Sequence, residues 1–192
     1  MTWKITLPEA GRPAHRPETL PDVWQFPIVV GLGANLPSPS HGAPAETLTA
    51  ALGALEGAGI GVLARSSWFE SAPVPASDQP WFVNGIAVVE TGRSPEALLG
   101  LLLRIEAEFG RTRGARNEAR ILDLDLIAFG EVVRQEERGI QIPHPRLQYR
   151  AFVLAPLAEI LPDWVHPVSR RPVSELLAAI PGDQAVRRLE TR

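Results

Sequence analysis

The side chains best suited to chemistry lie between Gly110 and Gly130. This segment opens with arginines at four of ten positions, namely Arg111, Arg113, Arg116 and Arg120. It then alternates between leucine and aspartate over 122–126. In a β-strand, residues two apart point to the same face, so Asp123 and Asp125 should stand side by side, roughly 6–7 Å apart. The alternating leucines should fill the opposite face.

This combination of charges has two interpretations. Two carboxylates held so close repel each other unless a cation or water lies between them, and guanidinium groups bind phosphates through paired hydrogen bonds. Together they describe a site for a magnesium–nucleotide complex. The alternative is a plain sheet edge with a wet face, whose aspartates pair with a solvated arginine loop. Because strands disfavour aspartate, the metal interpretation is the stronger one.

Composition restricts the class of protein. A chain of 192 residues can bury the core of one domain, and a formal charge of −3 argues against general adhesion to nucleic acid or membranes. There are no cysteines, which excludes disulfides, thiolate catalysis and zinc–thiolate sites. Neither a signal peptide nor an apolar run long enough for a bilayer is evident. We therefore expect a soluble, cytoplasmic protein.

The apolar periodicity predicts strands at 27–33, 61–70, 82–91 and 121–127, and helices that begin at Pro44 and at Ser94-Pro95. The order β-α-β-β-α-β is that of an α+β, ferredoxin-like fold, an antiparallel sheet with helices on one face, here plus C-terminal additions. The other face would be available for a ligand. We divide the chain into a poorly ordered, proline-rich extension (1–26), one domain (27–182) and a loose tail (183–192).

Three further features have more than one interpretation. The run GLGANL at 31–36 lacks the third glycine of a dinucleotide fingerprint, and no Gly-Lys-Ser/Thr follows, so it predicts a strand exit rather than a phosphate loop. Asn84 lies inside an expected strand, where it is either tied to the backbone or directed at a ligand. His144 lies between two prolines, which favours a stiff turn over a general base.

Taken together, the motifs resemble the 6-hydroxymethyl-7,8-dihydropterin pyrophosphokinase family of folate biosynthesis. The matching pieces, in the family's order, are GLGANL, SSWFESAPV, DQPWFVNGIAVVET, RIEAEFGR, ARILDLDLIAFG, IPHPRLQYRAFVLAPLAEI and PDWVHP. The resemblance implies that ATP gives its β,γ-diphosphate to the hydroxymethyl oxygen of the pterin and leaves as AMP. The partners would then be these small molecules, with no nucleic acid and no membrane, and a monomer is the working assumption.

The resemblance also implies roles for individual residues. Asp123 and Asp125 would hold two Mg²⁺ ions on the triphosphate of the co-substrate ATP, and would act in catalysis with Arg113 and Arg120. The residues implied to contact ATP are Glu106, Arg111, Arg113, Arg120, His144 and Arg150. The pterin pocket would combine two stacking rings, an amide that reads the polar edge of the heterocycle, and the backbone beside them: Phe82, Phe152, Asn84, Ser71, Ala72 and Val74.

The chain departs from the family pattern at four places. Members often carry a tryptophan in the region of Asn117, a tyrosine at the position of Phe82 and an aromatic residue at that of Pro145, and the loop after Leu36 is long here. None of these removes a metal ligand, so we expect an active enzyme. Two alternatives remain: a non-catalytic ligand sensor with the same fold, and another magnesium-dependent transferase with a different acceptor. The retained aspartates and arginines count against the first, and only the pocket residues count against the second.

Overall fold

The computed structural model describes residues 24, 26–111, 118–135 and 139–190. Its strands are β1 (Ile28–Ala34), β2 (Gly61–Arg65), β3 (Phe69–Ser71), β4 (Phe82–Glu90), β5 (Asp123–Phe129) and β6 (Val186–Arg188). Its helices are α2 (Pro44–Gly57), α3 (Pro95–Glu108), α4 (Ala151–Ile160) and α5 (Val173–Ala178), with a 3₁₀ turn at Leu147–Tyr149. In this described part of the chain, no helix is long and apolar enough to cross a membrane. The expected extension falls almost wholly outside the described residues.

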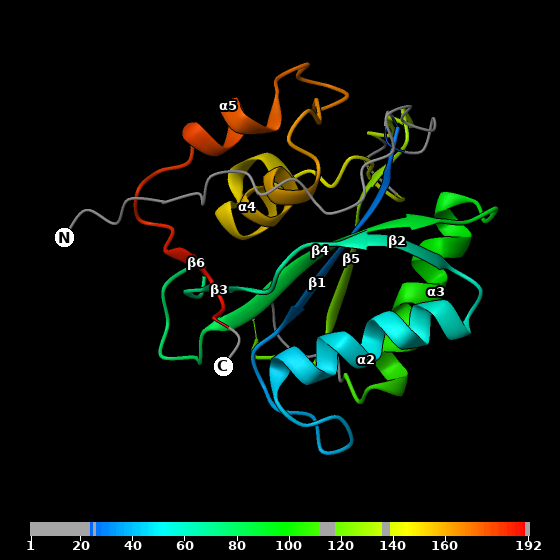
Figure 1. The fold of residues 1–192 in the computed structure, drawn as a ribbon, viewed down its shortest axis with the longest axis vertical. Helices are drawn as coiled ribbons and strands as arrows, with labels where there is room; N and C mark the ends of the chain where they lie inside the picture. Colours follow the sequence, from blue (N-terminus) through cyan, green and yellow to red (C-terminus); the bar gives the residue numbers. More distant parts are fainter. Residues whose placement is uncertain (1–23, 25, 112–117, 136–138, 191–192) are drawn as a thin grey trace.

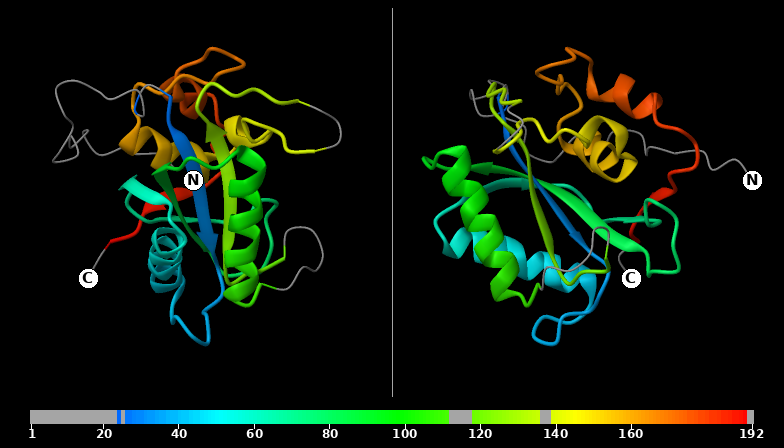
Figure 2. Two further views of the ribbon diagram at one scale, coloured as in Figure 1. Left: turned by 90° about the vertical axis from the view of Figure 1, so that its right-hand side faces the viewer. Right: turned by 180° about the vertical axis from the view of Figure 1, so that it is seen from behind.

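The strands form one antiparallel sheet (Figures 1 and 2). β1 lies between β5 and β4, and β4 pairs in turn with β2 and β3. Helix α2 follows the first strand and α3 precedes the strand that carries the aspartates. This is the ferredoxin-like arrangement, and the predicted fold class is confirmed.

Helices cover both faces of the sheet. Figure 1 shows α2 and α3 on one side and α4 and α5 on the other. Leucines of α2 and α3 pack with Leu124 in one core, while Leu154 of α4 packs with Ile86 and Ile127 in a second core. The expectation of a second face left free for a ligand is therefore wrong for much of that face. A cavity lies at one end of that face, where β1 ends and β4 and β5 begin.

Helix α3 sets the position of the first arginine. Its start is capped as predicted, because Ser94 Oγ accepts a hydrogen bond from the Ala97 N–H at 3.3 Å. Its end is marked by Gly110, whose φ of +87° is a left-handed conformation that glycine adopts without strain. The Arg111 N–H then donates to the Glu106 carbonyl at 3.0 Å. The backbone of Arg111 is thus held against the helix end.

The prediction of a single strand over 61–70 is wrong, because the chain steps out of line between β2 and β3. The Ser66 hydroxyl accepts the Ile86 N–H at 3.0 Å, in place of a backbone carbonyl. The ring of Trp68 lies over Gly85, where a Cβ atom would come within 2.5 Å of it. As a result, β4 pairs with β2 along one half and with β3 along the other.

The prediction of a loose tail is wrong for residues 184–189. β6 pairs with β3, and the Arg187 guanidinium lies 2.7 Å from Glu70 and 5.1 Å from the centroid of the Trp81 ring. The Gln184 side chain accepts the Ala151 N–H at 2.9 Å at the start of α4. A three-residue strand with two arginines has no apolar period, so periodicity alone could not reveal it.

Candidate active site

The alternation predicted for the aspartate strand is confirmed. Leu122, Leu124 and Leu126 are buried in the core beneath α2 and α3. Ile127, two residues beyond Asp125, lies in the core beneath α4 and α5. Because alternate residues share a face, both aspartates lie on the α4 side of the sheet, at its open end.

The glycines of GLGANL separate the candidate residues. Gly33 pairs across the sheet with Asn84 on one side and with Asp123 on the other, and Gly31 pairs with Asp125. A Cβ atom at Gly33 would lie 3.3 Å from Asn84 Oδ1. These glycines therefore do more than end a strand, because they keep the surface between the amide and the two carboxylates free of side chains.

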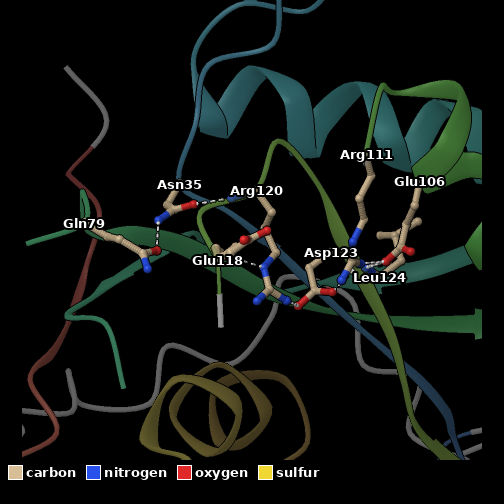
Figure 3. A network of polar contacts seen from close by, with 8 residues as sticks. All are labelled: Asn35, Gln79, Glu106, Arg111, Glu118, Arg120, Asp123 and Leu124. Carbon is tan, nitrogen blue, oxygen red and sulfur yellow. Dashed lines mark hydrogen bonds and ion pairs between the residues drawn. The ribbon is translucent and has the colours of Figure 1, made fainter. Parts of the chain in front are cut away.

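Both carboxylate oxygens of Asp123 accept hydrogen bonds from arginines (Figure 3). Arg111 Nη1 lies 2.5 Å from Oδ1, and Arg120 Nη1 lies 2.8 Å from Oδ2. Arg111 also pairs with Glu106 of α3. The arginines expected to meet phosphates thus contact a carboxylate that is expected to hold metal.

Glu106 lies beneath this network and is only 2% exposed. Its Oε1 accepts the Leu124 N–H at 2.7 Å, on the edge strand of the described sheet. Burial raises the pKa of Glu106 to about 7, although the Leu124 hydrogen bond and the charge of Arg111 act in the opposite direction. The carboxyl group therefore joins α3, β5 and Arg111 behind Asp123, and it does not line the cavity.

The donor set around Asp125 fits a magnesium–nucleotide complex. Burial, together with the negative charge of Asp123, raises the pKa of Asp125 to about 6, so a cation would relieve an unfavourable charge. No group of three or more His, Cys, Asp or Glu side chains suited to a metal occurs among the described residues. Two carboxylates without a third suit Mg²⁺, which is usually held by one or two carboxylates together with substrate phosphates.

A cavity of about 240 Å³ lies in front of these groups. It brings together the predicted pterin residues and part of the predicted phosphate site. From the predicted set it is lined by Ser71, Ala72, Val74, Phe82, Asn84, Arg120, Asp123, Arg150 and Phe152. Arg111, Asp125 and His144 do not line it, and Arg113 lies outside the described residues.

Asn84 is buried at the inner wall of the cavity, with 5% exposure. Its Nδ2 donates to Ser71 Oγ at 2.9 Å, so β3 orients the amide of a residue on β4. Arg150, the residue before α4, places its guanidinium carbon 5.3 Å from the centroid of the Phe152 ring. A flat polar heterocycle in this cavity would meet aromatic faces and an amide already held in position.

His144 is held in a turn, as the flanking prolines predict. Its backbone N–H donates to the Ile127 carbonyl at 2.8 Å, and its ring Nδ1 accepts a hydrogen bond from the backbone N–H of Arg146 at 3.2 Å. An accepting Nδ1 leaves the proton of the neutral ring on Nε2. Burial, together with the positive charges of Arg150 and Arg146, lowers the pKa of His144 to about 4. The ring is therefore a neutral donor and not a cation.

We expect His144 to stay neutral well below the usual range for histidine. In a ¹H–¹³C NMR titration its Cε1–H signal should shift only as the pH approaches about 4. His144→Gln, which removes that signal, supplies the assignment. A midpoint near 6.5, the ordinary value, would contradict the buried, charge-opposed environment described above.

The predicted set of site residues omits Asn35 and Gln79, which hydrogen bonds connect to it. Asn35, the residue after β1, is 2% exposed and contacts both Arg120 and Gln79 (Figure 3). Gln79 lines the cavity. The available signal was a polar residue directly after a buried strand, where a side chain is often held by neighbouring backbone groups.

The comparisons with known proteins agree with this geometry. Residues 29–162 match the family of 7,8-dihydro-6-hydroxymethylpterin-pyrophosphokinase (HPPK). The 2-amino-4-hydroxy-6-hydroxymethyldihydropteridine pyrophosphokinase of Synechocystis sp. is 44% identical over 154 residues, which cover 79% of this chain and 75% of that protein. The Pseudomonas aeruginosa protein of the same name is 43% identical over 155 residues, 80% of this chain and 91% of that one.

A solved structure shares the fold. The HPPK-DHPS protein of Plasmodium falciparum superposes with a TM-score of 0.62 at 14% identity, covering 80% of this chain and 45% of that one. At this identity the likeness concerns the fold alone. The sequence match spans most of the chain and includes the aspartate strand, Asn84 and the start of α4. The chain therefore belongs to the 7,8-dihydro-6-hydroxymethylpterin-pyrophosphokinase family.

Proposed function

We propose that this protein transfers the β,γ-diphosphate of ATP to 6-hydroxymethyl-7,8-dihydropterin in folate biosynthesis. The hydroxymethyl oxygen forms a bond to the β-phosphorus and gives up its proton to solvent, the bond from that phosphorus to the α,β-bridging oxygen breaks, and AMP leaves with the bridging oxygen. The observation that carries the proposal is one cavity that Phe82, Asn84 and Phe152 line together with Asp123 and Arg150. Membership of the family supports the same reaction.

The phosphate end of the cavity would be formed by arginines and carboxylates. Asp123 and Asp125 would hold two Mg²⁺ ions, which, when bound, neutralise charge on the triphosphate. Arg111, Arg120 and Arg150 would bind phosphate oxygens, and His144 would donate from Nε2. We assign Arg113 to the same group by resemblance alone. No covalent intermediate is needed, since positioning and charge stabilisation dominate phosphoryl transfer.

The arginines must exchange partners when the nucleotide binds. Arg111 and Arg120 donate to the same two oxygens that Asp123 would offer to metal. Phosphate oxygens are alternative acceptors for guanidinium groups, so the triphosphate can draw the arginines away and free the carboxylate. Metal affinity should accordingly be low without nucleotide and higher with it.

The pterin end would be formed by rings and an oriented amide. The heterocycle would stack between Phe82 and Phe152, with Asn84 bonding its polar edge. The hydrogen bond from Asn84 to Ser71 supports this assignment, because it fixes the direction of the amide before a ligand arrives. The backbone of Ala72 and Val74 would close the side of the pocket.

The reaction itself is tested by its products. Purified protein with ATP, Mg²⁺ and 6-hydroxymethyl-7,8-dihydropterin should release AMP and the pterin diphosphate, separated by chromatography, and no AMP without the pterin. ADP in place of AMP would indicate a different phosphotransferase. Binding of both compounds without turnover would indicate a sensor.

Replacing Asn84 by alanine should weaken pterin binding by about 1–3 kcal/mol, because a buried edge of the ligand loses its partner. ATP affinity should stay nearly unchanged, since Asn84 contacts Ser71 rather than the arginine network. Isothermal titration calorimetry with each ligand measures both effects. Ser71→Ala removes the hydrogen bond that orients Asn84 but leaves the Asn84 amide in place, so it should weaken pterin binding less than Asn84→Ala does. Equal losses for ATP and pterin would identify Asn84 as a structural residue.

A further inference from the structure

Asn35 connects two segments that belong to different ends of the cavity. Its side-chain Oδ1 accepts a hydrogen bond from the backbone N–H of Arg120 at 2.7 Å. The backbone N–H of Asn35 donates to the Arg120 carbonyl at 3.0 Å. The backbone of Arg120 is therefore held on both sides by one residue. Arg120 in turn donates to Asp123 Oδ2 at 2.8 Å, so this arm leads to the candidate phosphate site.

The other arm leads to the pterin side. Asn35 Nδ2 donates to Gln79 Oε1 and to the Pro80 carbonyl, both at 3.2 Å. These two residues end the loop between β3 and β4, whose residues Ala72 and Val74 line the cavity. Figure 3 shows the Asn35 amide between Gln79 and Arg120, with Arg120 extending toward Asp123.

The position of Asn35 on the sheet makes it a firm attachment point. It follows β1, which pairs with β4 on one side and β5 on the other. The side chain is buried, so an amide that loses one segment is left with an unsatisfied group. All hydrogen bonds of the Asn35 amide form only when the β3–β4 loop and Arg120 are both in place. A ligand that fixes one of these segments therefore lowers the free-energy cost of ordering the other.

We propose that Asn35 is a positioning residue that couples pterin binding to nucleotide binding. The inference rests on the proposed function, because it takes the two ends of the cavity to be the sites of the two substrates. Coupling between sites is reciprocal: if nucleotide tightens pterin binding by some factor, pterin tightens nucleotide binding by the same factor. Typical factors are about 5–150.

The test measures that factor in wild type and in Asn35→Ala. The pterin is titrated calorimetrically into protein alone and into protein saturated with Mg²⁺ and α,β-methylene-ATP, in which the bond to be broken cannot be cleaved. Wild type should bind pterin at least about fivefold more tightly with the analogue. In Asn35→Ala the ratio should approach one, while the affinity of each ligand for the free protein changes by less than about threefold.

Three variants separate coupling from simple loss of structure. Gln79→Ala keeps Asn35 and removes one of its two pterin-side acceptors, leaving the Pro80 carbonyl, so it should lower the ratio in part even if Asn35→Ala does not fold. Asn35→Asp keeps the acceptor for Arg120 and loses the donor to both Gln79 and Pro80, so it should lower the ratio more than Gln79→Ala does. Ser38→Ala removes hydrogen bonds within the neighbouring loop, to the Ser40 and His41 N–H groups, and should leave the ratio at the wild-type value.

The outcomes are distinct. Failure of wild type to bind the pterin overturns the proposed function. Binding of both ligands by wild type with a ratio near one overturns the coupling. A wild-type ratio in Asn35→Asp, which lacks both pterin-side hydrogen bonds, would make Asn35 an anchor for Arg120 alone and would likewise overturn the coupling.

Discussion

Replacing Asp125 by asparagine should lower turnover by at least about a thousandfold, because bound metal contributes several kcal/mol of charge stabilisation and each 1.36 kcal/mol is a factor of ten in rate. Asparagine preserves the shape of the side chain and removes the charge that would hold the ion. Product formation under saturating Mg²⁺, ATP and pterin measures the effect.

The same substitution should leave the fold intact. Burial and the charge of Asp123 raise the pKa of Asp125, so the ionised carboxylate is unfavourable in the folded protein without metal. The Asp125→Asn variant should therefore unfold at a temperature equal to or higher than that of wild type when a chelator is present. Asp183→Asn, at an exposed aspartate, is the matched control for loss of one charge. Turnover close to wild type would remove Asp125 from the metal site.

Replacing Arg111 by alanine should slow the transfer step by about 10²–10³-fold, the usual effect of removing one preorganised donor from a charged transition state. The guanidinium pairs with Glu106 as well as with Asp123, so it can leave Asp123 for a phosphate oxygen while Glu106 still holds it in position. ATP affinity should fall much less, because the full interaction develops only as charge moves onto the departing phosphate. Single-turnover kinetics beside an ATP titration separates the two quantities.

Two controls accompany Arg111. Arg111→Lys keeps the positive charge but not the planar fork, and should recover only part of the rate. Arg104→Ala removes an exposed arginine from α3, the helix that ends just before Arg111, and should behave as wild type. An unchanged transfer rate with weaker ATP binding would make Arg111 a plain nucleotide anchor. We expect Arg113→Ala likewise to slow the transfer step more than it weakens ATP binding. Arg113 lies outside the described part of the chain.

Local patterns predicted the parts of the site that depend on local geometry. The alternation of Leu and Asp has a period that only a strand satisfies, so the two faces of β5 could be assigned before the sheet was known. The N-cap at Ser94 and the end of α3 at Gly110 follow from the same kind of rule. Sequence resemblance then supplied Asn84, Phe82 and Phe152, whose roles no periodicity could have indicated.

The parts that escaped prediction depend on partners far along the chain. Asn35 and Arg120 are 85 residues apart, and Ser67 and Glu159, which tie the step between β2 and β3 to α4, are 92 apart. No local pattern identifies such a partner. The sequence predicts the second helical layer, α4 and α5, only as a C-terminal addition. Nothing in the sequence around Leu154 and Leu176 indicates which face of the sheet they pack against.

The pairing of β6 with β3 has a kinetic consequence. Glu70 and Arg187 are 117 residues apart, and in the described sheet the three-residue β6 pairs only with β3, so few contacts offset the closure of this loop until β3 has paired with β4. β3 carries Ser71, and Gln184 holds the first N–H of the helix that carries Phe152. We therefore expect the sheet around β1 to assemble first, and the pterin wall to become rigid only when residues 184–188 have docked. A folding intermediate of this chain would then have the two aspartates of β5 in place before the pterin pocket could select its substrate.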